Sequence, residues 1–192
     1  MKVKLKLTNK TKRLIVSLIS VAILGTGGAA YLNDDLANLL QSRQPGLYQV
    51  TAVNDGDTIT VKASGNTETV RLIGIDTPEL HHPEKPVQCF AVAARQFTVR
   101  LIADRPVRLE ADWLDDNRDL YGRLLRYVYL PDGTLLNAAI VQQGYGFAYT
   151  HFPFTKLEQM RRLEREARAA KRGLWSGCTI EDSGRGFQTN PS

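Results

Sequence analysis

The feature that most limits the possible folds of this 192-residue chain is the stretch RLIGIDTPE at residues 71–79. Its first half is a run of branched apolar residues around one glycine, which predicts a buried strand. Its second half places Asp76 and Glu79 just beyond the strand, and Pro78 disfavours a helix there because it restricts Thr77 to extended conformations. A cation at one end and two acids at the other indicate a phosphate-and-metal site; the alternative is an ordinary polar loop.

The beginning of the chain has the pattern of a targeting segment. Residues 14–32 form a run of 19 residues without a charged side chain, close to the ~20 that span a bilayer as a helix. A basic lead before such a run is typical of export. The run can remain as a membrane anchor or be cleaved near residues 28–30, and we favour the anchor, with the folded part outside the cytoplasm. The lead contains no acid and six cations: Lys2, Lys4, Lys6, Lys10, Lys12 and Arg13.

The targeting segment also explains the basic charge of the chain. The formal net charge is +5, from 25 basic and 20 acidic residues. Without the six leading cations, 19 basic residues face 20 acidic ones, a net charge of −1. The overall charge is therefore no argument for nucleic-acid binding, and any anion site in the folded part must be local.

The remaining chain divides into a polar linker at residues 33–45, one domain at 46–178 and a flexible tail at 179–192. Apolar periodicity and turn residues in the domain predict an α+β, mainly β fold: a five-stranded OB-type barrel with about three helices, preceded by the hydrophobic N-terminal helix. The expected strands are residues 47–53, 58–61, 69–75, 107–111 and 124–130, and the expected helices are 89–103, 135–143 and 155–171. Thr155 and Glu158 predict a capping box at the start of the last helix.

Two further charged residues lie at strand starts. The sequence Asp55-Gly56 between two alternating runs predicts a hairpin turn, which places Asp57 at the head of the second strand. Arg123 follows Gly122 at the start of the fifth strand, and the alternative for this arginine is a surface cation paired with Asp119. Arginines of the last helix alternate with acids, which favours a solvated face over a nucleic-acid contact.

Three motif blocks resemble, in order and spacing, those of the thermonuclease, or staphylococcal nuclease-like, family. They are VNDGDT at residues 53–58, Arg71 followed by DTPE at 76–79, and YGR at 121–123; NAAIVQQG at 137–144 and GLWS at 173–176 resemble later landmarks. The resemblance covers residues 47–176. It implies an OB-fold nuclease that hydrolyses DNA and RNA with one calcium ion, and we expect a monomer.

Specific roles follow from the resemblance by position. It implies that Asp57, Asp76 and the Thr77 carbonyl bind the metal, and that Arg71, Glu79 and Arg123 are catalytic. It also suggests that Tyr121 and Tyr149 contact the nucleotide. The family often has a second tyrosine where this chain has His151.

The chemistry of these side chains agrees with such roles. Calcium prefers carboxylate and carbonyl oxygens, Glu79 is a candidate general base for an attacking water, and the forks of Arg71 and Arg123 suit phosphate oxygens. We expect an endonuclease. The alternative is a catalytically silent nucleic-acid-binding module on the same barrel, which would need neither Glu79 nor the two aspartates.

Two cysteines are absent from the best-known member of the family. In an exported chain Cys89 and Cys178 can pair, whereas in a cytosolic chain they would be reduced.

Overall fold

The computed structural model describes residues 46–63, 65–80, 86–182, 184 and 186–192. The predicted targeting segment at residues 1–32 and the linker at 33–45 lie outside these residues. Within the described ranges, no helix is long and apolar enough to cross a membrane.

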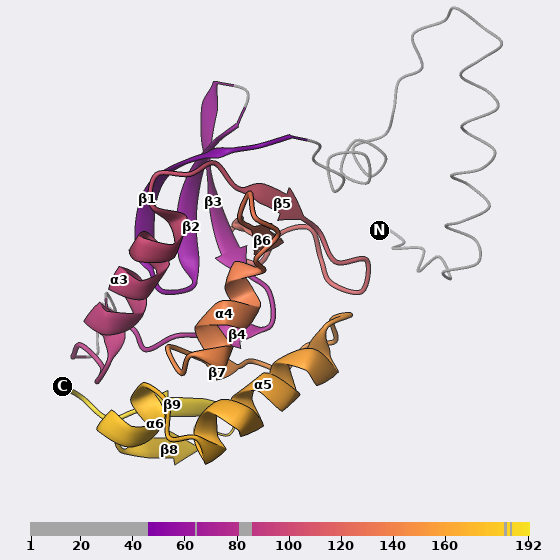
Figure 1. Cartoon of the computed structure of the whole chain (residues 1–192). Coiled ribbons are helices and arrows are strands. Elements are labelled where there is room, and N and C mark those ends of the chain that lie inside the picture. The colour runs from indigo at the N-terminus through magenta and orange to yellow at the C-terminus, as the bar shows by residue number, and fades with distance from the viewer. Residues whose placement is uncertain (1–45, 64, 81–85, 183, 185) are drawn as a thin grey trace, which may run out of the picture. The chain divides into compact units, whose positions relative to one another are not determined.

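A five-stranded sheet forms the centre of the described part (Figure 1). Its strand order is β1-β2-β3-β6-β5; β3 and β6 run parallel, and the other neighbours are antiparallel. All five strands were predicted from the sequence, β3 as part of a longer strand at residues 69–75. Their bounds are β1 Gln49–Asp55, β2 Thr58–Ala63, β3 Asn66–Leu72, β5 Arg108–Glu110 and β6 Leu124–Tyr129.

The sheet does not close into a barrel, so that part of the prediction is wrong. The edge strands of the described sheet, β1 and β5, form no ladder with each other. Just before these strands, Tyr48 and Val107 exchange backbone hydrogen bonds of 2.7 and 2.8 Å. β5 is only three residues long, and its one ladder within the described residues is with β6. The fold is thus a mixed α+β arrangement built around one five-stranded sheet.

The predicted strand at residues 69–75 is broken in the middle. β3 ends at Leu72, and Gly74 adopts a left-handed backbone with φ +73° before the two-residue strand β4, Ile75–Asp76. β4 leaves the main sheet and pairs with β7, Phe147–Ala148. A side chain at Gly74 would collide with the Phe154 ring, so the glycine permits both the turn and the close packing.

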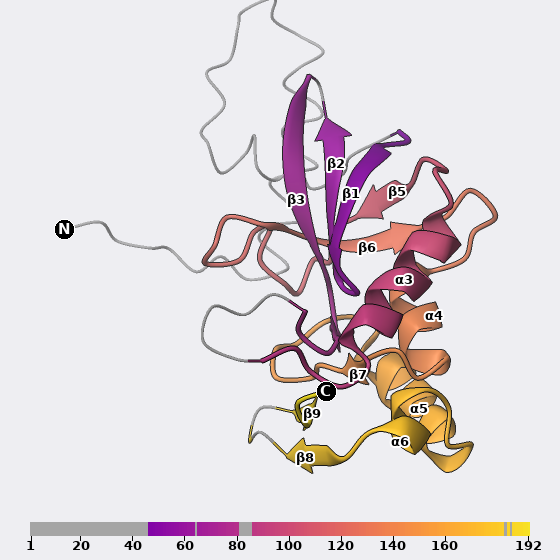
Figure 2. The same cartoon turned by 90° about the vertical axis from the view of Figure 1, so that its left-hand side faces the viewer.

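Four helices are present in the described residues, one more than expected (Figure 2). Three match the predictions in place: α3 Ala91–Ile102, α4 Leu136–Gln142 and α5 Leu157–Ala169. The fourth, α6 Leu174–Gly177, has only four residues, too short to give a periodic signal. Both views place α3 alongside β1.

The predicted capping box of α5 is absent. The helix begins after Lys156 without a side-chain cap, and the Thr155 hydroxyl instead donates to Asp112 Oδ2 at 2.7 Å. The buried carboxylate of Asp112 competes successfully for that hydroxyl because it also accepts the Tyr127 hydroxyl and the Thr155 amide. The arginines of α5 form the expected exposed pairs, Arg161 with Glu158 and Arg162 with Glu166.

The predicted tail at residues 179–192 contains a pair of strands that the sequence analysis did not predict. β8 Ile180–Asp182 pairs with β9 Phe187–Thr189. The Gly-, Ser- and Asn-rich composition predicted looseness, but Phe187 packs against Phe147 and Trp175, a tertiary contact that composition does not reveal.

One buried amide links α4 to the break after β3. Asn137 is fully buried; its Nδ2 donates to the carbonyls of Ile73 and Arg126, and its Oδ1 accepts the Val128 amide. The bond to the Ile73 carbonyl satisfies a backbone group at the end of the strand, and the Arg126 carbonyl accepts the Ile73 amide as well as the Asn137 side chain. The position of β4, and hence of Asp76, is therefore fixed from the helix side as well as from the sheet.

Candidate functional site

Arg71 lies between two carboxylates that come from different strands. Its Nη2 donates to Asp76 Oδ1 at 2.6 Å, and its Nη1 is 3.3 Å from Asp57 Oδ2. Nη1 also donates to the carbonyls of Ile75 at 2.8 Å and Leu72 at 3.2 Å. The guanidinium is thus held by backbone oxygens on one side and by charge on the other, with only 15% of its side chain exposed.

Asp57 connects the first hairpin turn to the segment after β4. Its Oδ2 accepts both the amide and the hydroxyl of Thr77, at 2.8 and 2.9 Å, while its Oδ1 accepts the Thr58 hydroxyl. The turn itself is held by Thr98 of α3, which donates to the Gly56 carbonyl at 2.6 Å. Asp57 lies at the head of β2 as predicted, and its side chain is almost completely buried.

Glu79 and Tyr149 lie close enough to act on the same charges. The pKa of Arg71 is raised: burial opposes the charged form, but Asp57, Asp76, Glu79 and Tyr149, in decreasing order, outweigh it. The Tyr149 amide donates to the Gly74 carbonyl at 3.0 Å, which places this ring residue beside the break in the strand.

The carboxylates exceed the positive charge available to them. The pKa of Asp76 rises to about 7, first because protein surrounds the carboxyl and then because Asp57 and Glu79 repel its negative form; Arg71 offsets this only in part. A concentration of carboxylates around a single guanidinium favours the binding of a further cation.

The donor set fits a hard divalent cation. Asp57 and Asp76 contribute carboxylate oxygens. The amide and hydroxyl of Thr77 both donate to Asp57, and no described residue donates a hydrogen bond to the Thr77 carbonyl. Within the ranges that the structure describes, no three His, Cys, Asp or Glu side chains enclose an ion by themselves. Water and a phosphate oxygen would therefore have to complete the shell, as is common for calcium and magnesium.

Arg123 is held by a different acid. Its Nε donates to Asp119 Oδ2 at 2.6 Å, and Asp119 Oδ1 accepts the amides of Tyr121 and Arg123, both at 3.0 Å. The guanidinium also lies over the Tyr121 ring, 5.3 Å from its centroid. Asp119 therefore shapes the turn and orients the arginine, and the surface pair considered from the sequence is present.

Arg123 nevertheless immediately precedes the strand that pairs with the strand of Arg71. β6 begins at Leu124, and its next residue, Leu125, is opposite Arg71 in the parallel pair of β3 and β6. In the described part of the chain, no hydrogen bond or ion pair joins Arg123 to the Arg71 cluster.

The structure thus brings together part of the predicted set directly. Hydrogen bonds and ion pairs join Arg71, Asp57, Asp76 and Thr77. Glu79 and Tyr149 lie close enough to affect the charge of Arg71. Arg123 and Tyr121 lie apart from this cluster, on the turn that Asp119 stabilises. Cys89 and Cys178 form a disulfide with an S–S distance of 2.04 Å.

One residue at the site carried no signal in the sequence. The side-chain Oε1 of Gln88 accepts the Glu79 amide at 2.7 Å, and the Gln88 amide donates to the Glu79 carbonyl at 3.1 Å. Nine positions separate the two residues, and nothing in their spacing indicates that the chain returns to Glu79 after the loop.

Comparison with known proteins identifies relatives of this chain. Residues 69–177 match the family described as "Staphylococcal nuclease homologue". The thermonuclease of Staphylococcus hyicus is 37% identical over 130 residues, which cover 67% of this chain and 75% of the relative. The thermonuclease of Staphylococcus intermedius is 38% identical over 129 residues, with the same shares.

For a relative from Bacillus, the aligned region covers a smaller share of the relative's own length. Endonuclease YncB of Bacillus subtilis (strain 168) is 40% identical over 124 residues, which cover 64% of this chain and 58% of the relative. Together these homologues support a nuclease function.

The raised pKa of Asp76 predicts a pH-dependent cost to stability in the metal-free protein. Because the folded-state pKa of about 7 exceeds the ordinary 3.8, ionisation disfavours the folded state, and its stability falls as the pH rises through that window. We expect Asp76→Asn to remove this fall. Thermal midpoints should be measured in a chelating buffer at pH 4.5 and 8. The midpoint of the variant relative to that of the wild type should be higher at pH 8 than at pH 4.5.

A matched control is Glu158→Gln, which removes an exposed carboxylate of α5. Its midpoint relative to the wild type should change little between the two pH values. An equal effect of Asp76→Asn at both pH values would show that its ionisation costs the fold nothing.

Proposed function

This chain belongs to the staphylococcal nuclease family, and we propose that it is a calcium-dependent endonuclease that hydrolyses phosphodiester bonds of DNA or RNA. The observation that carries the proposal is the cluster in which Arg71 lies between Asp57 and Asp76, with Thr77 and Glu79 beside them. A module that only binds nucleic acid gains nothing from three acids at its phosphate site, because they repel the phosphate.

Asp57, Asp76 and the Thr77 carbonyl would hold the ion. When bound, calcium would neutralise excess carboxylate charge and attract a phosphate oxygen as a Lewis acid. Asp57 is fixed by hydrogen bonds that it already accepts from Thr77, so this carboxylate needs little reorganisation on binding.

Arg71 is placed to bind the diester without leaving its position. The carbonyls of Leu72 and Ile75 accept hydrogen bonds from Nη1 and keep the guanidinium in place. Nη2 can therefore donate its hydrogen bond to a phosphate oxygen instead of to Asp76. Donors that are fixed before the reaction stabilise the charge that develops on the phosphoryl oxygens.

Arg123, just before β6, can supply a second guanidinium fork. Asp119 binds its Nε, and within the described residues neither terminal nitrogen makes a hydrogen bond. The end of the guanidinium is therefore available for a bidentate contact with phosphate. Tyr121, 76% exposed, and Tyr149 are placed to contact the nucleotide.

Glu79 has the role of general base in this proposal. Its carboxylate would accept the proton of the attacking water while Arg71 and Arg123 hold the phosphate. Its backbone is fixed on both sides by Gln88.

Removal of calcium tests the proposal most directly. Incubated with circular plasmid, the protein should produce nicked and linear DNA in calcium, no product in a chelating buffer, and product again when calcium is restored. Nicked circles are the mark of internal cleavage. Cleavage that continues in chelator would refute calcium dependence, and retention of DNA without any cleavage would support the silent binding module.

Substitution of the three proposed catalytic side chains should reduce turnover. We expect Arg71→Lys, Arg123→Lys and Glu79→Gln each to lower kcat by roughly 10²-fold or more, comparable to the loss of one preorganised donor. Lysine keeps the charge but loses the fork. Initial rates on a labelled oligonucleotide, with thermal midpoints as a folding check, measure the effect.

Arg108→Lys is the matched control, because Arg108 is an exposed arginine paired with Glu110 in β5. It should retain near-native turnover. Any one of the three test variants that also does so would have no part in the mechanism.

We further propose that the protein is exported and held at the membrane by residues 14–32. The basic lead and apolar run support this, and so does the disulfide, since such bonds persist in oxidising compartments. Fractionation of the natural host, with N-terminal sequencing, should find the full-length chain in membranes and accessible to external protease. A mature protein that begins after residues 28–30 would show secretion instead, and activity confined to the cytoplasm would refute export.

A further inference from the structure

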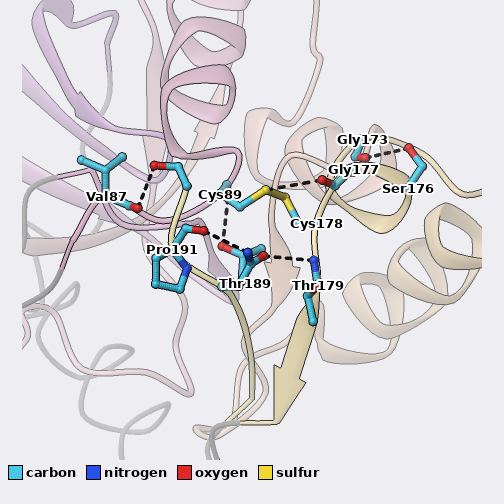
Figure 3. The surroundings of a disulfide bond; sticks show 11 residues. Val87, Cys89, Gly173, Ser176, Gly177, Cys178, Thr179, Thr189 and Pro191 are labelled. Atoms are coloured by element: carbon cyan, nitrogen blue, oxygen red, sulfur yellow. Dashed lines mark hydrogen bonds between the residues drawn. A yellow bond between two sulfur atoms is a disulfide. The ribbon is translucent and has the colours of Figure 1, made fainter.

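The chain continues beyond the family match as an ordered arm. The match ends at residue 177, and the described residues from Cys178 to Ser192, here called the C-terminal arm, contain β8 and β9. The arm turns back toward the segment before α3, where the Cys89–Cys178 disulfide joins the two (Figure 3).

The arm pairs with the segment around Gln88 on its outer side. The Cys89 amide donates to the Asn190 carbonyl at 2.8 Å, and the Ser192 amide donates to the Val87 carbonyl at 2.9 Å. These two bonds flank Gln88, which forms an antiparallel bridge with Pro191. Gln88 is therefore bound by the arm on one side and binds Glu79 on the other.

Further contacts near the disulfide close this arrangement into a ring. The amide of Asn190 donates to the Thr179 carbonyl at 3.1 Å, and its side-chain oxygen accepts the Thr179 amide. The Thr189 hydroxyl donates to the Cys89 carbonyl at 2.9 Å (Figure 3). The path from Cys89 through Cys178, Thr179 and Asn190 back to Cys89 thus consists of the disulfide, one peptide bond and several hydrogen bonds.

Aromatic packing fixes the far end of the arm. Phe187 contacts Phe147 and Trp175, and the guanidinium of Arg168 lies over both Trp175 and Phe187. Phe147 belongs to β7, the partner of the strand that carries Asp76. The arm is therefore attached to the two segments that border the site.

We propose that Gln88 is a positioning residue for Glu79 and that the disulfide-linked C-terminal arm holds Gln88 in place. The proposal rests on the proposed nuclease function, in which Glu79 is the general base. Gln88 fixes the Glu79 backbone by two hydrogen bonds, and the arm fixes Gln88 by bonds at both neighbouring residues. A general base must lie within hydrogen-bond reach of its proton, and misplacement by about 1 Å can cost up to ~10²-fold in rate.

The first experiment separates positioning from folding by two substitutions of one residue. Gln88→Met has a similar shape but no acceptor for the Glu79 amide, whereas Gln88→Glu keeps an acceptor oxygen. On a labelled single-stranded oligonucleotide in calcium, we expect Gln88→Met to lower kcat by roughly tenfold with KM unchanged. Gln88→Glu should recover most of kcat. Equal rates for Gln88→Met and wild type would overturn the proposal.

A double-mutant cycle tests whether Gln88 acts through Glu79. In a Glu79→Gln background, Gln88→Met should cause no further fall in kcat, because the group that it positions is already inactive. The same tenfold fall in both backgrounds would mean that Gln88 acts elsewhere.

The role of the arm is tested by Cys89→Ser with Cys178→Ser. We expect hydrogen exchange at the amides of Glu79 and Gln88 to become at least tenfold faster, with kcat lowered and KM unchanged. Glu181→Gln, an exposed change in β8, should alter neither quantity. Unchanged exchange at both amides would refute the link between arm and site.

Amide exchange also separates this proposal from the proposed function. Gln88→Met should accelerate exchange at the Glu79 amide whether or not the protein cleaves nucleic acid. Fast exchange in Gln88→Met together with an inactive wild type would support the positioning of Glu79 by Gln88 but refute the proposed nuclease function. Slow exchange in Gln88→Met together with an active wild type would refute only the positioning role.

Discussion

The rest of the site depends on the position of one buried guanidinium between two acids. Arg71 bonds Asp76 at 2.6 Å and lies 3.3 Å from Asp57, and two backbone carbonyls hold it in place. Removing charges from water is costly unless they are paired, so the acids and the cation are best understood as one unit. The unit is incomplete, because burial and, after it, repulsion from Asp57 and Glu79 raise the pKa of Asp76 in spite of Arg71. This uncompensated negative charge is the physical reason to expect a divalent cation here.

The fold brings the unit together by interrupting its own sheet. A continuous strand from residue 69 to 75 would carry Asp76 along the ladder of β3, away from β7. The left-handed turn at Gly74 instead redirects the chain into β4, and Asn137 binds the carbonyl exposed at the break. The hairpin turn supplies Asp57 from the opposite direction, and Thr77 joins the two by donating twice to its carboxylate. A defect in the regular sheet thus positions the functional residues.

Arg123 and the C-terminal arm surround this unit in different ways. Asp119 holds the Arg123 side chain by Nε and leaves its end available, so the second fork is oriented but not occupied. The arm, which lies beyond the family match, contacts the backbone of segment 87–89, which lies within it. In our proposal, Asp57 and residues of the family match supply the chemistry, and an extension beyond the match stabilises the geometry of the general base.

Local periodicity, turn residues and motif spacing were enough to predict the five strands of the central sheet, three of the helices, the hairpin that places Asp57, and the family. Contacts between distant residues, in contrast, set whether the sheet closes, where β3 breaks, why Thr155 binds Asp112 instead of capping α5, and how β8 pairs with β9. The contact of Gln88 with Glu79 is likewise tertiary, since its hydrogen bonds join two segments nine positions apart. Each of these features rests on a contact between distant residues, and local sequence carries no record of such contacts.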